Sequence, residues 1–284
     1  MTAHSIEVEA GQRFEFGKNW QRFLDTLTPA RIATAEESIR RTLGVDSLQG
    51  KRFLDIGSGS GLFSLSARRL GAEVVSFDFD PQSVACTSSL RERFFRGDPA
   101  WRIEESSVLD EVYMASHRGY DVVYSWGVLH HTGAMWQAIA NAMQTVGPGG
   151  TFVISIYNDQ GPWSRRWKKL KQIYNRLPRF LQPGYTVLVM GARELPAIVS
   201  SIVRLRPLDY IKRYTGYYQQ RGMGRWRDMV DWIGGYPFEV AKPEEVFDFF
   251  RQRGFELLAL KTCAGGLGCN EFVFRRGVDT GPAD

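Results

Sequence analysis

The sequence predicts an α/β protein whose sheet is built mainly from parallel strands. Short apolar runs alternate with helical patterns between residues 50 and 157, and the first run ends in a glycine-rich turn that opens a helix. The 284-residue chain also has the apolar and charged fractions of a soluble globular protein. Parallel strands joined by right-handed crossovers are expected at 51–56, 73–78, 101–105, 120–125 and 150–157.

Residues 1–49 are predicted to form an N-terminal helical segment. The stretches 20–24 and 33–43 have helical spacing, and Thr28-Pro29 is typical of a helix start. The segment could lie over a ligand or cover one face of the sheet, and both interpretations stay open. A later helix at 243–250 and two strands at 255–262 and 270–275 are expected to complete the sheet, with a loop at 264–268 between these strands.

Composition indicates a reduced, cytoplasmic protein. The sequence contains no run of 18 or more apolar residues, so no transmembrane helix is expected. The first residues lack a basic flank followed by an apolar core, so no secretory signal is expected. The three cysteines, Cys86, Cys263 and Cys269, do not have zinc-like spacing. No acidic cluster has convincing metal-ligand spacing, so no metal cofactor is expected.

The glycine-rich turn predicts a ligand of the nucleoside type. Gly57, Gly59 and Gly61 follow Asp55 directly, and glycine lets a backbone turn sharply and approach a ligand closely. Asp78 ends the next strand about 20 residues later, where a carboxylate can hold ribose hydroxyls. Because Asp55 would repel an anion and attract a cation, the pattern favours a ligand with a ribose, an adenine and a positive end.

Five stretches, in order, resemble the class I S-adenosylmethionine (SAM)-dependent methyltransferases. They are 54–61, 75–80, 105–110, 120–131 and 146–154. The resemblance covers roughly 50–157 and 238–276, and it is nearest to ubiquinone-type small-molecule O-methyltransferases. It implies a Rossmann-like seven-stranded sheet, SAM as the cofactor, and methyl transfer to a small molecule, with a hydroxyl oxygen as the expected acceptor.

The resemblance also implies which residues bind the cofactor. Asp55 and Gly57 would face its amino-acid end, Asp78 would hold the ribose, and Phe79 would cover the adenine. The full set of expected cofactor contacts is Asp55, Gly57, Ser58, Gly59, Gly61, Asp78, Phe79, Ser107, Val108 and Trp126. For Phe79 and Trp126, ordinary core packing is the alternative.

Two adjacent histidines are the first candidates for the catalytic base. His130 and His131 follow the fourth strand, and a histidine there can remove a proton from a substrate hydroxyl. His131 is favoured because the Leu-x-His pattern resembles quinone-ring O-methyltransferases, while a helix-capping or backbone-binding role is the alternative. Glu239 is a second candidate base. The candidates for substrate contact are Tyr157, Asn158, Trp232 and Tyr236.

Residues 159–237 interrupt the methyltransferase pattern, which occupies 50–158 and 238–276, and predict a helical insertion after strand five. Between 160 and 230 the net charge is +12, against −7 for the rest of the chain. The stretch 185–205 is apolar, and aromatic residues include Tyr210, Tyr214, Tyr217 and Tyr218.

Three interpretations of the insertion compete. It could cap a small, anionic or aromatic substrate, contact a membrane surface that carries a lipophilic substrate, or bind RNA. The cap ranks first, and the apolar stretch disfavours an exposed nucleic-acid surface. A protein that binds SAM without transferring its methyl group is a further alternative. The sequence does not identify the acceptor.

Overall fold

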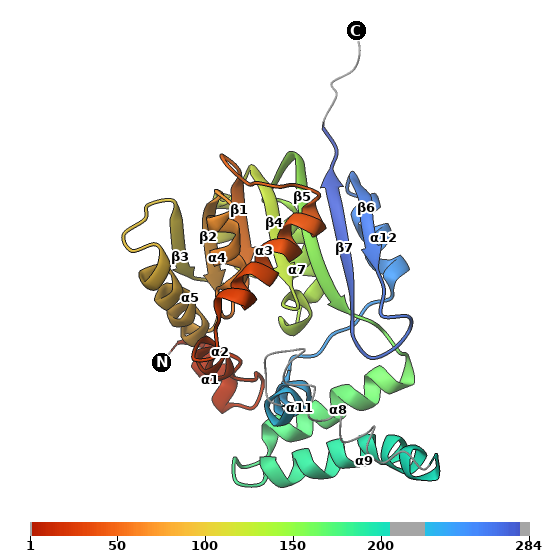
Figure 1. The fold of residues 1–284 in the computed structure, drawn as a ribbon. Coiled ribbons are helices and arrows are strands. Elements are labelled where there is room, and N and C mark those ends of the chain that lie inside the picture. Colours follow the sequence, from red (N-terminus) through yellow and green to blue (C-terminus); the bar gives the residue numbers. More distant parts are fainter. Residues whose placement is uncertain (1, 205–224, 279–284) are drawn as a thin grey trace.

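Seven strands form one central sheet in the computed structural model, which describes residues 2–204 and 225–278. The strands are β1 (Arg52–Ile56), β2 (Glu73–Asp78), β3 (Trp101–Glu105), β4 (Tyr120–Trp126), β5 (Val146–Tyr157), β6 (Phe255–Lys261) and β7 (Cys269–Arg276). Their order is β3-β2-β1-β4-β5-β7-β6. The first five run parallel, and β7 is antiparallel to both neighbours (Figure 1). The predicted seven-stranded α/β sheet is confirmed.

One strand begins earlier than the sequence predicts. β5 starts at Val146 rather than at residue 150, because Val146 already pairs with Tyr120 across a register shift. Gly147, Gly149 and Gly150 are residues that favour turns, but they lie within this strand. Pairing with β4 therefore overrides the local turn signal.

Helices cover both faces of the sheet and create two apolar cores. One face carries α3 (Pro29–Leu43), α4 (Leu62–Arg69) and α5 (Pro81–Phe94), and the other carries α6 (Glu111–Ser116), α7 (Met135–Met143) and α12 (Pro243–Arg251). Successive strand residues enter opposite cores: Phe53 belongs to the first and Leu54 to the second. This alternation fixes the direction of every side chain at the strand ends.

The N-terminal segment contains one helix more than the sequence predicts. Besides α2 (Gly17–Leu24) and α3, the chain forms α1 (Ala3–Glu9). The Thr28 side chain accepts a hydrogen bond from the Arg31 amide at the start of α3, and Pro29 occupies the first turn, as expected.

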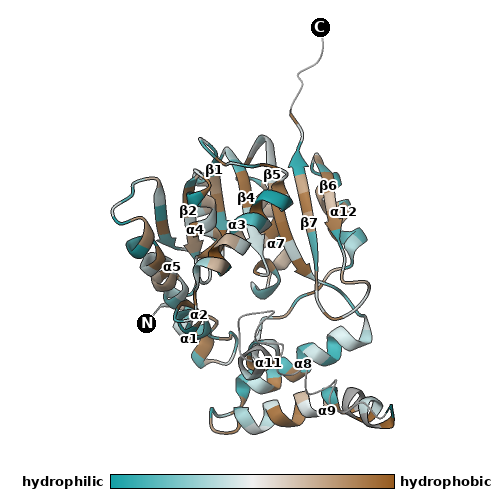
Figure 2. Ribbon diagram, viewed as in Figure 1, coloured by the Kyte–Doolittle hydropathy of each residue, from teal (hydrophilic) through white to brown (hydrophobic). Residues whose placement is uncertain are grey.

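Three described helices lie between β5 and α12: α8 (Pro162–Arg176), α9 (Gln182–Val203) and α11 (Arg225–Gly234). They have an apolar cluster of their own, centred on Trp167, Tyr174, Ile233 and Phe238. In Figure 1, α1 and α2 lie beyond the same end of the sheet as the helices labelled α8, α9 and α11. Figure 2 shows brown, apolar segments along α9 at the outer edge of this layer. The boundaries at 159 and 237 stay a prediction, and Tyr210, Tyr214, Tyr217 and Tyr218 lie outside the described residues.

Candidate functional site

The turn between β1 and α4 can form only with glycine. Gly57 has a φ of +74°, and a Cβ atom there would lie 2.3 Å from a methyl carbon of Val128. Gly61 has a φ of +78°, and its Cβ would lie 2.8 Å from the Thr87 Cα atom. The turn therefore leaves bare backbone at the carboxyl ends of β1 and β2, where open α/β sheets bind ligands.

Asp78 occupies the end of β2 beside this turn. Its Oδ2 atom accepts a hydrogen bond from the Gly59 amide at 2.9 Å, and its Oδ1 atom accepts one from the Asp80 amide at 2.9 Å. Burial raises the pKa of Asp78 to about 6. The structure thus joins the predicted ribose-binding acid to the predicted glycine turn, and this cradle fits a nucleoside-type cofactor.

Asp55 is held by a buried chain of hydrogen bonds. Ser64 donates its hydroxyl to Asp55, Ser76 donates to Ser64 at 2.8 Å, and the Trp101 indole donates to Ser76 at 2.9 Å. The Asp55 side chain has no cationic partner among these contacts, and burial raises its pKa to about 7. This carboxyl is therefore fixed in place, with an ionisation that responds to pH near neutrality.

The other predicted cofactor residues are in different environments. Phe79 is half-buried, with the Arg13 guanidinium 4.9 Å from its ring centre. Trp126 is 47% exposed at the end of β4. Val108 packs in the core and offers its carbonyl to Asn141, whereas the half-buried Ser107 hydroxyl accepts a bond from the following turn.

The sequence analysis missed residues that join the N-terminal segment to the predicted cofactor crevice, which is the region around the glycine turn and Asp78. Asp80 accepts a hydrogen bond from the Gly17 amide at 2.7 Å and lies 3.6 Å from the His4 Nε2 atom. A Cβ atom at Gly59 would be 3.0 Å from the Trp20 indole nitrogen. The sequence did offer one signal: Asp80-Pro81 is typical of a helix start, and Asp80 is the N-cap of α5. α2 thus reaches the glycine turn, and α1 reaches Asp80 just after β2.

The two predicted catalytic histidines differ in what they can contact. They lie in η1 (Leu129–His131), directly after β4. His131 makes a 2.6 Å hydrogen bond from Nδ1 to the Pro237 carbonyl oxygen. A carbonyl can only accept, so Nδ1 carries the proton and Nε2 is left with a lone pair. Burial lowers the pKa of His131 to about 3, so its ring is neutral at pH 7.

His130 is completely enclosed. Its ring centre lies 4.1 Å from that of Tyr157, and burial lowers the pKa of His130 well below its usual value. Glu239 accepts a hydrogen bond from the Met135 amide at 3.1 Å, and burial raises its pKa. This placement favours His131 and Glu239 over His130 for contact with a substrate.

The four predicted substrate residues separate into two groups. Tyr157 and Trp232 pack edge to face with ring centres 5.5 Å apart, and Tyr236 accepts a hydrogen bond from the Gln172 side chain. Asn158 instead accepts a 3.0 Å hydrogen bond from Asn270 and holds the loop before β7. These contacts anchor the loop, and a role of Asn158 in substrate contact stays a prediction.

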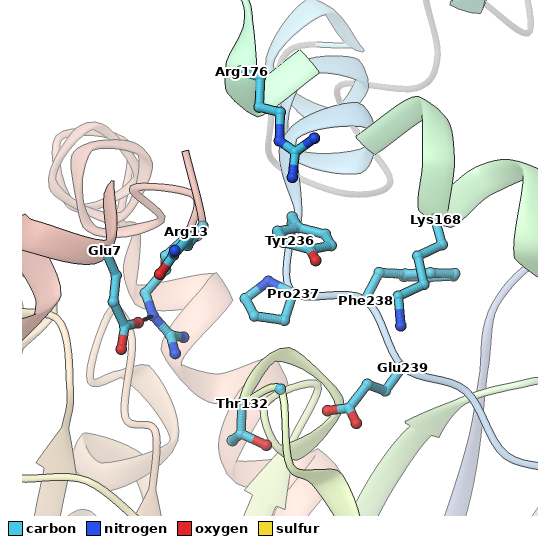
Figure 3. Close-up of a pocket in the computed structure, with 11 residues that line it drawn as sticks. Glu7, Arg13, Thr132, Lys168, Arg176, Tyr236, Pro237, Phe238 and Glu239 are labelled. Atoms are coloured by element: carbon cyan, nitrogen blue, oxygen red, sulfur yellow. Dashed lines mark hydrogen bonds and ion pairs between the residues drawn. The ribbon is translucent and has the colours of Figure 1, made fainter. Parts of the chain in front are cut away.

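A pocket of about 420 Å³ opens beside His131. Its walls come from the N-terminal segment, the residues after η1, α8 and the stretch before α12 (Figure 3). The lining residues are Glu7, Gln12, Arg13, Thr132, Gly133, Lys168, Arg176, Tyr236, Pro237, Phe238 and Glu239. Arg13 also donates to the His131 carbonyl at 2.9 Å and lies 4.9 Å from the ring centre of Phe79, so this one side chain contacts both the pocket and a predicted cofactor residue.

A buried lysine packs against Phe238, which lines the pocket. Lys171 donates a hydrogen bond to the Trp232 carbonyl, and its Nζ atom is 4.8 Å from the centre of the Phe238 ring. Burial lowers the pKa of Lys171 to about 7. In the described ranges 2–204 and 225–278, no group of three or more His, Cys, Asp or Glu side chains could hold a metal ion.

The glycine turn, the acids at the ends of β1 and β2 and the sheet order define a protein of the class I methyltransferase type. A family description, "Methyltransferase domain", matches residues 24–186 of the sequence. The chain therefore belongs to the methyltransferase domain family, and its cofactor is S-adenosyl-L-methionine.

Individual relatives are similar over part of their length. Ubiquinone biosynthesis O-methyltransferase from Methylobacterium sp. (strain 4-46) is 28% identical over 169 residues, which are 55% of this chain and 66% of that protein. The tRNA U34 carboxymethyltransferase of Methylococcus capsulatus is 30% identical over 162 residues, or 57% of this chain and 43% of that one. The chain thus spans about two thirds of the first relative and under half of the second.

Two solved structures have the same fold at low sequence identity. Magnesium protoporphyrin IX methyltransferase from Synechocystis PCC 6803, with bound SAH, is 13% identical with a TM-score of 0.52, and the match covers 87% of this chain and 84% of that one. The [4+2]-cyclase SpnF is 12% identical with a TM-score of 0.51, over 86% and 80%.

Proposed function

We propose that this protein transfers a methyl group from SAM to a hydroxyl oxygen of a small molecule. The observation that carries the proposal is His131, whose Nδ1–H is engaged by the carbonyl of the pocket residue Pro237, so that Nε2 keeps a lone pair. The ubiquinone biosynthesis O-methyltransferases among the relatives support an oxygen acceptor.

The chain's own residues would divide the work between binding and proton transfer. Bound SAM supplies a methyl group on a sulfonium, which is a good leaving group. Asp78 would bind the ribose, Asp55 would attract the ammonium of the amino-acid end, and the walls of the pocket would align the acceptor and exclude water. Either His131 or Glu239 would take the acceptor's proton. In the cofactor-free protein Glu239 is the stronger base, because burial raises its pKa and lowers the pKa of His131 to about 3.

Titration calorimetry with S-adenosylhomocysteine tests the cofactor half of this proposal. Replacing Asp78 by Ala should weaken binding by roughly tenfold to a hundredfold, because a charge-assisted hydrogen bond is lost. Wild-type affinity in a folded Asp78→Ala variant would contradict the assignment. Asp110→Ala is the matched control, because Asp110 instead caps α6, where its carboxylate accepts from the Tyr113 amide.

Rate measurements test the catalytic half. His131→Ala should lower kcat about a hundredfold and leave S-adenosylhomocysteine affinity within about twofold, since general-base catalysis typically contributes this much. A kcat equal to that of the wild type would exclude His131 and move the assignment to Glu239, which Glu239→Gln then tests in the same assay. Methyl transfer itself is scored with labelled SAM against a panel of hydroxylated compounds. No transfer by a protein that binds the cofactor would favour a non-methylating SAM protein, because the fold alone does not determine the reaction.

The outer face of α9 supports peripheral contact with a membrane that carries a lipophilic acceptor. Leu188, Leu195, Val199 and Val203 follow one another at helical spacing, are 70%, 57%, 49% and 75% exposed, and have no charged residue on their stripe. Between 160 and 204 the sequence has nine Lys or Arg and one acid, which suits anionic head groups. No helix in the described part of the chain is long and apolar enough to cross a membrane.

Flotation with vesicles of anionic and of neutral lipid tests this contact. The wild type should float with anionic vesicles, and Leu188→Gln/Leu195→Gln should not. The tRNA-modifying relative keeps RNA as the competing interpretation of the basic charge. RNA binding with a steep salt dependence and no flotation would favour it. A cytoplasmic location stays a prediction.

A further inference from the structure

The pocket beside His131 contains positive charge that the proposed methyl transfer does not use. Three cationic side chains line it, Arg13, Lys168 and Arg176, and they come from two separate segments of the chain. In Figure 3, Arg176 and Lys168 extend from α8 toward Tyr236, Phe238 and Glu239, while Arg13 enters from the opposite side. A pocket that gathers like charges in this way is suited to an anionic ligand.

The packing of α8 fixes the direction of two of these cations. Lys168, Gln172 and Arg176 are four residues apart and therefore share one face of the helix. Gln172 donates a 3.0 Å hydrogen bond to the Tyr236 hydroxyl, which turns this face toward the pocket. Trp167 and Tyr174 are buried on another face, so α8 cannot rotate without exposing them.

The charges in the pocket are not equally neutralised. The Arg13 Nε atom lies 2.5 Å from the Glu7 carboxylate, and Arg13 also donates to the His131 carbonyl. Glu239 accepts a hydrogen bond from the Met135 amide, and burial raises its pKa although the nearby positive charge of Lys168 acts to lower it. Among residues 2–204 and 225–278, no carboxylate forms an ion pair with Lys168 or Arg176, and both side chains are exposed to the pocket and solvent.

We propose that Lys168 and Arg176 bind a carboxylate or phosphate group on the methyl acceptor. The acceptor is then a hydroxylated organic acid or phosphate ester, an inference that rests on the proposed methyl transfer. Tyr236 and Phe238 provide an apolar and aromatic wall for the body of such a molecule. Because Pro237, between these two residues, accepts the hydrogen bond of His131, an acid held by α8 places the rest of the molecule toward the histidine.

Direct binding measurements test this site with compounds that share a 4-hydroxyphenyl ring and carry either an acidic or a neutral group. The probes are 4-hydroxyphenylacetate, 4-hydroxyphenyl phosphate and the neutral 4-hydroxyphenylacetamide, each titrated into the full chain saturated with S-adenosylhomocysteine. At least one of the two acids should bind about tenfold or more tightly than the amide, as expected for charge-assisted hydrogen bonds. The stronger of the two identifies carboxylate or phosphate as the group recognised.

Matched charge variants then locate the preference. Lys168→Gln/Arg176→Gln should remove the preference for the acid and leave binding of S-adenosylhomocysteine and the melting temperature unchanged. Arg166→Gln/Lys169→Gln removes the same charge from exposed positions of α8 that do not line the pocket, and it should retain the preference.

The outcomes separate this site from the proposed reaction. Equal binding of acids and amide, no binding of either acid, or a preference that survives Lys168→Gln/Arg176→Gln would overturn the site. Loss of the preference in the control variant as well would reduce it to a general effect of net charge and would also overturn it. Acids that bind through Lys168 and Arg176 but are never methylated would leave the anion site intact and count against the proposed function instead.

Discussion

The predicted cofactor crevice and the pocket beside His131 are assembled in different ways. The crevice is centred on Asp55, the glycine turn and Asp78, which belong to two adjacent strands and lie within one short stretch of sequence. The pocket combines residues 7–13, 132–133, 168–176 and 236–239. A local motif therefore determines the first region, and long-range packing determines the second.

This difference has a functional consequence. Substitutions in α8 or in the stretch 236–239 can change the charge and shape of the pocket while the hydrogen bonds of Asp55 and Asp78 stay intact. Function in such folds depends on sites built onto a common frame. We expect cofactor binding and acceptor choice to vary independently in mutants.

The largest effect is expected from a substitution at Gly57, where the glycine turn has no room for a side chain. Gly57→Ala would bring a Cβ atom to 2.3 Å from Val128 at a φ of +74°. It should lower the free energy of unfolding by more than about 2 kcal/mol, from the combined backbone strain and overpacking. It should also abolish binding of S-adenosylhomocysteine. Urea denaturation and calorimetry measure the two effects.

A second glycine separates strain from crowding. Gly97 has a φ of +70° and open space around its missing Cβ atom. Gly97→Ala should therefore lower the free energy of unfolding by about 1 kcal/mol and leave cofactor binding unchanged. If Gly57→Ala and Gly97→Ala lower the free energy of unfolding by the same amount, Val128 must move aside in the first variant. The glycine turn would then be less constrained than its contacts indicate.

The sequence predicted the strands and the glycine turn between them well because their signals are local. Glycines, strand-ending acids and the Thr28-Pro29 helix start each act through their immediate neighbours, and the five parallel strands followed from apolar runs. The start of β5 was misplaced because pairing with β4 outweighs the turn preference of its glycines. The pocket was not predicted as a unit, since nothing local relates Arg13 to Arg176. The buried Lys171 was likewise missed, because its burial depends on Trp232 and Phe238 far along the chain.

A smaller effect is expected from the ionisation of Asp55. Burial raises the pKa of Asp55 to about 7, above its ordinary value near 4, so the folded protein holds a proton that the unfolded chain has released. Stability of the cofactor-free protein should therefore fall as the pH rises from about 4 through 7. Asp55→Asn should be more stable than the wild type at pH 8, by roughly 2 kcal/mol, and show less difference at pH 5.

The same ionisation should affect cofactor affinity in the opposite direction. If Asp55 attracts the ammonium of the cofactor, binding requires the carboxylate form. Affinity for S-adenosylhomocysteine should then weaken by up to about tenfold per pH unit below pH 7. Asp55→Asn should bind weakly at every pH. A wild-type affinity that is flat between pH 5.5 and 7.5 would count against this role.

The smallest effect tests whether the wall between the pocket and Lys171 is formed in solution. Burial lowers the pKa of Lys171 to about 7, so the unfolded chain binds more protons than the folded protein between about pH 7 and 10. Wild-type stability should rise with pH across this window, and Lys171→Met should remove that rise. At pH 6 the free energy of unfolding of Lys171→Met should lie within about 1 kcal/mol of the wild-type value. The variant is least disadvantaged at this pH, because there the wild type buries a charged ammonium and the variant does not.

Melting temperatures at pH 6 and pH 9 measure this difference, with Lys169→Met on the exposed side of α8 as the control. A difference between Lys171→Met and the wild type that does not depend on pH would mean that water reaches the Lys171 ammonium. The contacts of Lys171 with Trp232 and Phe238 would then be open. Because Phe238 also lines the pocket, the pocket would then be less tightly packed than the predicted cofactor crevice.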